Sequence, residues 1–289
     1  MKLPTILILA LLAVPAQDKT YDLRLEAKPV KGHKAELTEA SLMKMTMKMT
    51  GLPEPMAMGE ETNFAATQEV LSTEADGSSQ LRWVFSKATQ NKEGQNVALG
   101  FQGKTVLVKE AKGKAREFSY EGGGAIAEGD LPALKKAFMG GDEKPGEPSG
   151  AEMFAPKKPV KVGESWNPDI KTLAKGMFDG EMGEGIDLEK SSCKFTLKAV
   201  ESRSGADFGK IEGVLIVTLG QMGPMKLETP IALKMQLDLD VCIDGKAPDG
   251  LMKAKAEMKG KSSAAGPQGK IEIDIDMSMT GQTSVKSVK

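Results

Sequence analysis

Four methionines occupy every second position of the segment 43–49, with Lys or Thr between them. Side chains on a β-strand alternate between its two faces, so the four thioethers would lie on one face of a strand. Methionine fills apolar cores and lines adaptable ligand surfaces, and its soft sulfur is also a ligand for Cu(I). The stripe is therefore part of an ordinary core, the lining of an apolar ligand cavity, or a copper site. Its members are Met43, Met45, Met47 and Met49, and Met56 and Met58 follow after a turn.

The spacing of this stripe argues against copper. Successive residues on one face of a strand are about 6.6–6.8 Å apart, which is too far for neighbouring thioethers to share an ion unless a partner strand supplies further ligands. No histidine or cysteine stands next to the stripe. We therefore predict neither a metal site nor a cofactor, and we retain core packing and an apolar ligand surface as the main interpretations.

A second group of large apolar residues lies in the glycine-rich segment 176–185. Met177, Phe178 and Met182 stand there among glycines and acidic residues. Such a segment can form a mobile lid over an apolar cleft, or its apolar side chains can simply pack onto the sheet. These three residues and the methionine stripe are the predicted ligand-facing set.

Residues suited to catalysis are sparse. His33 is the single histidine and lies in a basic turn, so any Ser-His-Asp or Cys-His site would have to use it. Two carboxylate pairs, Asp238/Asp240 and Asp274/Asp276, have the spacing of a single strand face, but lysines on a neighbouring segment indicate a solvated charged surface. We therefore predict that the protein is not an enzyme.

The two cysteines, Cys193 and Cys242, have different neighbours along their strands. Cys193 shares a face with Phe195 and Leu197, which is typical of a core position, whereas Cys242 shares a face with acidic residues, which is typical of solvent exposure. Whether the two form a disulfide in an oxidising compartment stays open. Two cysteines and one histidine cannot build a zinc site of the usual kind.

Residues 1–16 have the pattern of a secretory signal peptide, with Lys2, a short apolar run and small residues before a cleavage position after about Ala16. The run is too short to span a bilayer, and no later segment is long and apolar enough. The chain has 39 basic and 40 acidic residues, a balance that does not favour nucleic-acid binding. We predict an exported, soluble, periplasmic or extracellular protein without a transmembrane span or a nucleic-acid partner.

Long β-strands separated by turn-forming clusters would carry these residues. We expect a β-rich N-terminal half (17–139), a Gly/Pro linker (140–157) and a β-rich C-terminal half (158–289). Two short helices are predicted, at 131–139 and at about 168–175. The predicted fold class is mainly β, with two antiparallel, long-stranded curved sheets or half-barrels and two short helices. The predicted strands are 19–27, 34–50, 58–74, 80–90, 96–102, 104–111, 114–120, 186–202, 208–220, 226–244, 250–260 and 270–287.

The last three predicted strands carry outer faces that are acidic, basic and acidic in turn. In an antiparallel meander these charges would lie opposite one another, which places 250–260 between 226–244 and 270–287. A further segment, Val214–Val217, is apolar on both faces, and we predict a central strand that is covered on each side.

The segment Pro159–Trp166 reads PVKVGESW and opens the C-terminal half. This motif resembles one in uncharacterised, exported bacterial proteins of a domain-of-unknown-function type, in which a β-rich half, a Pro-rich joint and a second β-rich half follow a leader. The resemblance implies no activity and no site residues. In the motif itself, Gly163 would form a turn and Trp166 would pack near a helix start. The long curved strands are also similar, at the level of fold, to periplasmic lipoprotein-carrier half-barrels.

The sequence favours two functional classes over an enzyme. The first is an exported, non-catalytic binding or carrier protein whose partner is a lipid or another apolar small molecule. The second is a structural or interaction protein of the cell envelope that pairs with an envelope protein through sheet surfaces and edges. A closed apolar pocket of roughly 300 Å³ or more would favour the first class.

Overall fold

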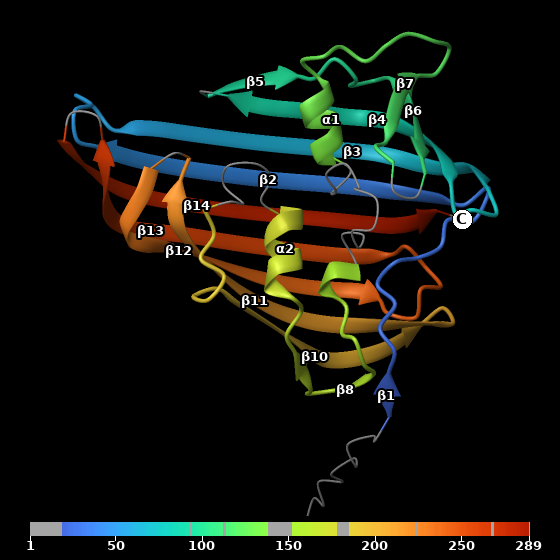
Figure 1. The fold of residues 1–289 in the computed structure, drawn as a ribbon. Helices are drawn as coiled ribbons and strands as arrows, with labels where there is room; N and C mark the ends of the chain where they lie inside the picture. Colours follow the sequence, from blue (N-terminus) through green and yellow to red (C-terminus); the bar gives the residue numbers. More distant parts are fainter. Residues whose placement is uncertain are drawn as a thin grey trace, which may run out of the picture.

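The protein is built around one large antiparallel β-sheet to which both halves of the chain contribute (Figure 1). The computed structural model describes residues 19–92, 94–111, 114–137, 152–177, 185–223, 225–266 and 269–288. The predicted signal peptide and residues 140–151 of the predicted linker lie outside these ranges. No helix among the described residues is both long and apolar enough to cross a bilayer.

Twelve strands form the large sheet, and a separate pair joins β1 to β8. The order is β7-β6-β4-β3-β2-β14-β13-β12-β11-β10-β9, and β5 pairs with β4. The helices are α1 (Leu131–Ala137), α2 (Ile170–Met177) and the short 3-10 helix η1 (Glu152–Phe154). The strands are β1 (Thr20–Tyr21), β2 (Lys34–Met49), β3 (Met56–Thr73), β4 (Ser79–Lys92), β5 (Gln95–Ala98), β6 (Thr105–Glu110), β7 (Glu117–Tyr120), β8 (Val160–Lys161), β9 (Ser165–Trp166), β10 (Ser192–Arg203), β11 (Ala206–Met222), β12 (Met225–Cys242), β13 (Gly250–Gly266) and β14 (Gly269–Val288).

The predicted fold class is confirmed: the chain is mainly β, with long antiparallel strands in a curved sheet and two short helices. The strands of the two predicted halves meet in the middle of the sheet, where β14 pairs with β2 over the whole length of β2. Each half therefore continues the other's sheet through backbone hydrogen bonds.

The predicted order of the last three long strands is also confirmed, because β13 pairs with β12 on one side and with β14 on the other. Lys253 lies opposite Asp238 on β12. Towards β14, Lys259 Nζ lies 3.1 Å from an Asp276 carboxylate oxygen, and Lys261 Nζ lies 3.5 Å from one of Asp274. The alternating charge sign of the three outer faces thus corresponds to real cross-strand pairs.

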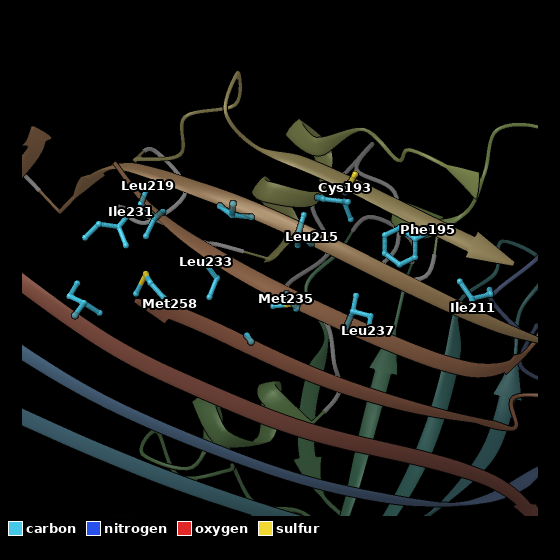
Figure 2. Packing of buried hydrophobic residues seen from close by; sticks show 14 of the residues in the cluster. Cys193, Phe195, Ile211, Leu215, Leu219, Ile231, Leu233, Met235, Leu237 and Met258 are labelled. Carbon is cyan, nitrogen blue, oxygen red and sulfur yellow. The ribbon is translucent and has the colours of Figure 1, made fainter. Parts of the chain in front are cut away.

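The two helices mark the inner face of the sheet, which we define as the face that carries α1 and α2 (Figure 1). Two separate apolar clusters lie on it. The N-terminal core contains Leu134 of α1, and the C-terminal core contains Leu173 of α2. Figure 2 shows the C-terminal core, which includes Cys193, Phe195, Ile211, Leu215, Leu219, Ile231, Leu233, Met235, Leu237 and Met258.

The PVKVGESW segment forms part of this C-terminal core. Gly163 has φ +88°, which fits the predicted turn. The Trp166 indole donates from Nε1 to the carbonyl oxygen of Phe154 at 2.8 Å, and its ring stacks on Phe195 with centroids 6.0 Å apart. The motif thus anchors the start of the C-terminal half onto β10.

The segment Val214–Val217 departs from its prediction on one face. It lies in β11, between β10 and β12, and its inner residues Leu215 and Val217 are fully buried. On the outer face, however, Val214 is 39% exposed. The predicted cover on both faces is therefore wrong, because the helices and both cores lie on the inner face alone.

Gly213 provides a packing prediction. It lies directly opposite Phe195 on β10, and a Cβ added at Gly213 would overlap the Phe195 ring. We expect Gly213→Ala to lower the free energy of unfolding by about 1–3 kcal/mol through overpacking. Gly59→Ala is the control, since a Cβ there meets no atom closer than 3.9 Å. Urea unfolding of both variants tests the prediction, and equal stability of the two would contradict it.

Candidate binding surface on the inner face

A row of four methionines crosses the inner face at one register of the sheet. Met258 of β13 lies opposite Met277 of β14, Met277 lies opposite Met45 of β2, and Met45 lies opposite Met58 of β3. Directly opposed residues on antiparallel strands project to the same face, so the four side chains are neighbours. Strands that are distant in sequence thus bring four thioethers together.

Further methionines flank this row on the same face. Met279 lies opposite Met43, and Met47 lies opposite Met56. At the next register Met49 lies opposite the buried Ile273 and packs against the C-terminal core. We use the name methionine surface for Met43, Met45, Met47, Met56, Met58, Met277 and Met279.

The methionine surface adjoins the C-terminal core, against which Met47, Met277 and Met279 pack, and extends from there towards the N-terminal core. At one end of β14, Ile273 and Ile275 are fully buried in the C-terminal core, and at the other end Val285 packs against the N-terminal core. Between these ends the methionines of β2 and β14 are only half-buried, and Met56 and Met58 are 39% and 50% exposed. This middle part of the inner face is therefore apolar and partly open to solvent.

A carboxylate borders the methionine surface. Glu60 of β3 lies opposite Met43, and the Thr62 hydroxyl donates to Glu60 Oε1 at 3.2 Å. Thr62 is itself buried, on the same face. A polar edge thus adjoins the apolar surface on the side towards the N-terminal core.

The structure describes some, but not all, of the predicted ligand-facing residues. Met43, Met45, Met47 and Met49 share the inner face of β2, as their alternation predicts. Met177 is the last residue of α2, and Phe178 and Met182 lie outside the described residues, so the proposed lid stays a prediction. The sequence interpretation did not anticipate Met277 and Met279 as cross-strand neighbours of the stripe. Their own alternation with polar residues was visible, but their pairing with β2 was not.

His33, Ser287 and Asp249 form a chain of contacts, but in the wrong order for a hydrolytic triad. His33 Nε2 lies 3.1 Å from Ser287 Oγ, while Ser287 Oγ donates to Asp249 Oδ2. A triad needs the imidazole between the carboxylate and the hydroxyl. Here the hydroxyl lies between the other two groups. We interpret the contact as a tie that holds the end of β14 to the start of β2 and to the turn before β13.

The predicted carboxylate pairs take part in ion pairs on the outer face. Asp274 and Asp276 face lysines of β13, as described above. Asp240 accepts two hydrogen bonds from Arg203, at 2.9 and 3.0 Å. This bidentate contact is the geometry of a structural Arg–carboxylate pair. The arrangement agrees with the interpretation of these acids as a charged outer surface.

Both cysteines are free and buried. Cys193 donates from Sγ to the carbonyl oxygen of Pro168 at 3.1 Å, and burial raises the pKa of its thiol. The predicted solvent exposure of Cys242 is wrong. Cys242 does lie on the outer side of β12, but Phe208 and Ala206 cover it and make a small third cluster there. The two thiols therefore lie in different clusters.

Glu201 allows a prediction about pH. Hydrogen bonds from Lys210 and Arg203 lower the pKa of Glu201 from 4.5 to about 2. A carboxylate whose pKa is lower in the folded state adds stability above the pKa of the unfolded state, and this contribution is lost as the pH falls through the folded pKa. We expect the stability difference between the wild type and Glu201→Gln to shrink from pH 4.5 down to about pH 2. Chemical unfolding at several pH values measures this, and a difference independent of pH would contradict it.

Comparison with known proteins adds little to this picture. No family model and no curated protein matches the chain. The outer membrane protein OprG from Pseudomonas aeruginosa is 9% identical, with a TM-score of 0.21, over 90% of this chain and 99% of that one. A DUF1329 family protein from Desulfovibrio piger ATCC 29098 is 10% identical, with a TM-score of 0.16, over 84% of this chain and 83% of that one. The second is of the domain-of-unknown-function type that the PVKVGESW motif resembles, but TM-scores this low carry no argument.

Proposed function

We propose that the protein is an exported, non-catalytic binding protein that holds an apolar small molecule, such as a lipid, against its methionine surface. One observation carries the proposal. The inner face is closed by fully buried aromatic and aliphatic side chains in both cores, and between them it offers a half-buried stretch made of methionine.

The choice of residue supports a ligand of variable shape. Methionine is unbranched, with three rotatable bonds, so its side chain adapts to different apolar partners. In the C-terminal core, the inner positions of β12 are taken by Leu233, Met235 and Leu237, which are all buried. The methionine surface therefore differs from this core by its partial exposure and not by residue type alone.

The driving force for binding would be the removal of apolar surface from water. Each Å² of such surface contributes about 25 cal/mol. A ligand that covers Met43, Met45, Met277 and Met279 would also touch the more exposed Met58, since these residues are adjacent across β14, β2 and β3. The polar edge at Glu60, with Lys92 of β4 at the opposite register position, favours a ligand that has a polar group at that end.

Native mass spectrometry of the protein purified from the envelope fraction of its own cells tests this proposal. We expect a population with an added mass of lipid size, which is lost when the protein is unfolded and refolded in lipid-free buffer. A chain that carries no added mass, and that takes up no lipid when mixed with envelope lipid extract, would contradict the proposal. Co-purification of a stoichiometric envelope protein instead would favour the alternative, a structural or interaction protein.

A further inference from the structure

The pairing of β2 with β14 and β3 changes which thioethers can share a ligand. Within β2, the methionines are separated by about 6.6–6.8 Å, the repeat of one strand face. Across strands, directly opposed Cα atoms are only about 4.5–5.5 Å apart. Met45 has such a neighbour on each side, Met277 on β14 and Met58 on β3.

Three sulfur atoms can therefore converge over the middle strand. The methionine side chain has three rotatable bonds, which allows the sulfurs of Met277 and Met58 to lean towards that of Met45. Met43 and Met279 form the adjacent opposed pair, one repeat further along the same two strands. Each lies about 6.6–6.8 Å along its strand from Met45 or Met277, so neither is counted among the ligands.

The chemistry of these ligands selects a soft ion. Uncharged thioethers bind Cu(I) and Ag(I) in preference to hard divalent ions such as Mg²⁺ or Ca²⁺. The lysines of β2, Lys44 and Lys48, are exposed and project to the opposite face of the sheet, whereas the Glu60 carboxylate lies on the inner face opposite Met43. Lys92 of β4 lies at the register position opposite Glu60, so the charge at this edge does not select the ion, and the thioethers do. Met58, which is 50% exposed, leaves an entry path from solvent.

We propose that the inner face binds one soft monovalent metal ion, Cu(I) or Ag(I), through the thioethers of Met45, Met58 and Met277. The metal site does not depend on the proposed apolar ligand. A metal ion needs the sulfur atoms, whereas an apolar ligand needs only apolar surface, which leucine would also provide. The spacing within one strand argues against a copper site, but here β14 and β3 supply the further thioethers that a single strand lacks.

Titration of the full chain with Ag(I), which needs no reductant, tests the site directly. We expect one Ag(I) per chain in a Cys193→Ala, Cys242→Ala variant, which removes the two competing free thiols. We also expect changes in the methyl resonances of Met45, Met58 and Met277 when the methionine methyl groups are labelled with carbon-13. Cu(I), added without oxygen in competition with the chelator bicinchoninate, should bind with the same stoichiometry. Absence of binding, or changes spread evenly over all methionine methyl groups, would overturn the proposal.

Substitution by leucine separates the sulfur from the apolar side chain. Met→Leu changes volume little and is usually well tolerated. Met45→Leu and Met277→Leu should each weaken Ag(I) binding at least tenfold, and circular dichroism should show that both variants keep the fold. Met153→Leu, a half-buried methionine on η1, is the matched control and should bind Ag(I) as the wild type does. Equal binding by all three variants, or equal loss in all three, would refute the site.

Discussion

Phe195→Ala should lower the free energy of unfolding by about 3–5 kcal/mol, the range for loss of a fully buried aromatic side chain. Phe195 has no exposed surface. Its ring lies 5.5 Å from the ring of Phe154 and 6.0 Å from that of Trp166, measured between centroids. It also fills the space over Gly213, which has no side chain of its own. Its removal would thus leave a cavity bounded by η1, β9 and β11.

Urea unfolding followed by circular dichroism measures the loss. Phe118→Ala on β7 is the control, because that side chain is only half-buried, and we expect it to lose less than half as much. A protein domain typically has a free energy of unfolding of about 5–15 kcal/mol, so a loss of the expected size can be measured. If the alanine variant is too unstable to purify, Phe195→Leu should give a smaller loss. A loss below about 1 kcal/mol for Phe195→Ala would show that the ring does not support the C-terminal core.

Met45→Lys should weaken binding of a neutral apolar ligand, with lauryl alcohol as the probe, at least tenfold. Met45 lies in the middle of the methionine surface, with Met277 and Met58 on either side. An apolar ligand over this point would have to cover an ammonium group without a partner, which is costly. In the free protein the long lysine side chain can extend to water, so we expect the fold to persist. A tenfold change corresponds to about 1.4 kcal/mol.

Two matched variants separate this effect from a general one. Thr46→Lys puts the same charge on the exposed outer face one residue further along, opposite Asp276, and should bind the alcohol as the wild type does. Met45→Leu keeps the apolar surface and should also bind it. The account would be wrong if Met45→Lys bound the alcohol normally, or if Thr46→Lys lost as much affinity.

Much of the fold could be predicted because the pattern within each strand is strong. The alternation of apolar and polar residues predicts the bounds of β2, β3 and β12 to within about two residues, since only one face of the sheet is buried. The charge signs of β12, β13 and β14 predict their order, because opposite charges face one another across β12 and β13 and ion pairs link β13 to β14 on the outer face. Both short helices begin within about two residues of the predicted start.

The rest depends on contacts that no local pattern records. The pairing of β14 with β2 joins strands at opposite ends of the chain, and many other strands with an apolar face would fit the same edge. The methionine surface exists only because of that pairing, so the sequence predicted the stripe on β2 without its neighbours. Cys242 looked exposed because its strand face is acidic, but Phe208 of the neighbouring strand covers it.

The most direct measurement is the methionine methyl spectrum of the wild-type protein during titration with lauryl alcohol. The account predicts that the methyl resonances of Met43, Met45, Met277 and Met279 shift together and saturate, while that of Met153 on η1 stays unchanged. Resonances that do not move at all, or that move only outside the methionine surface, would contradict the claim that this surface is where the protein binds an apolar molecule.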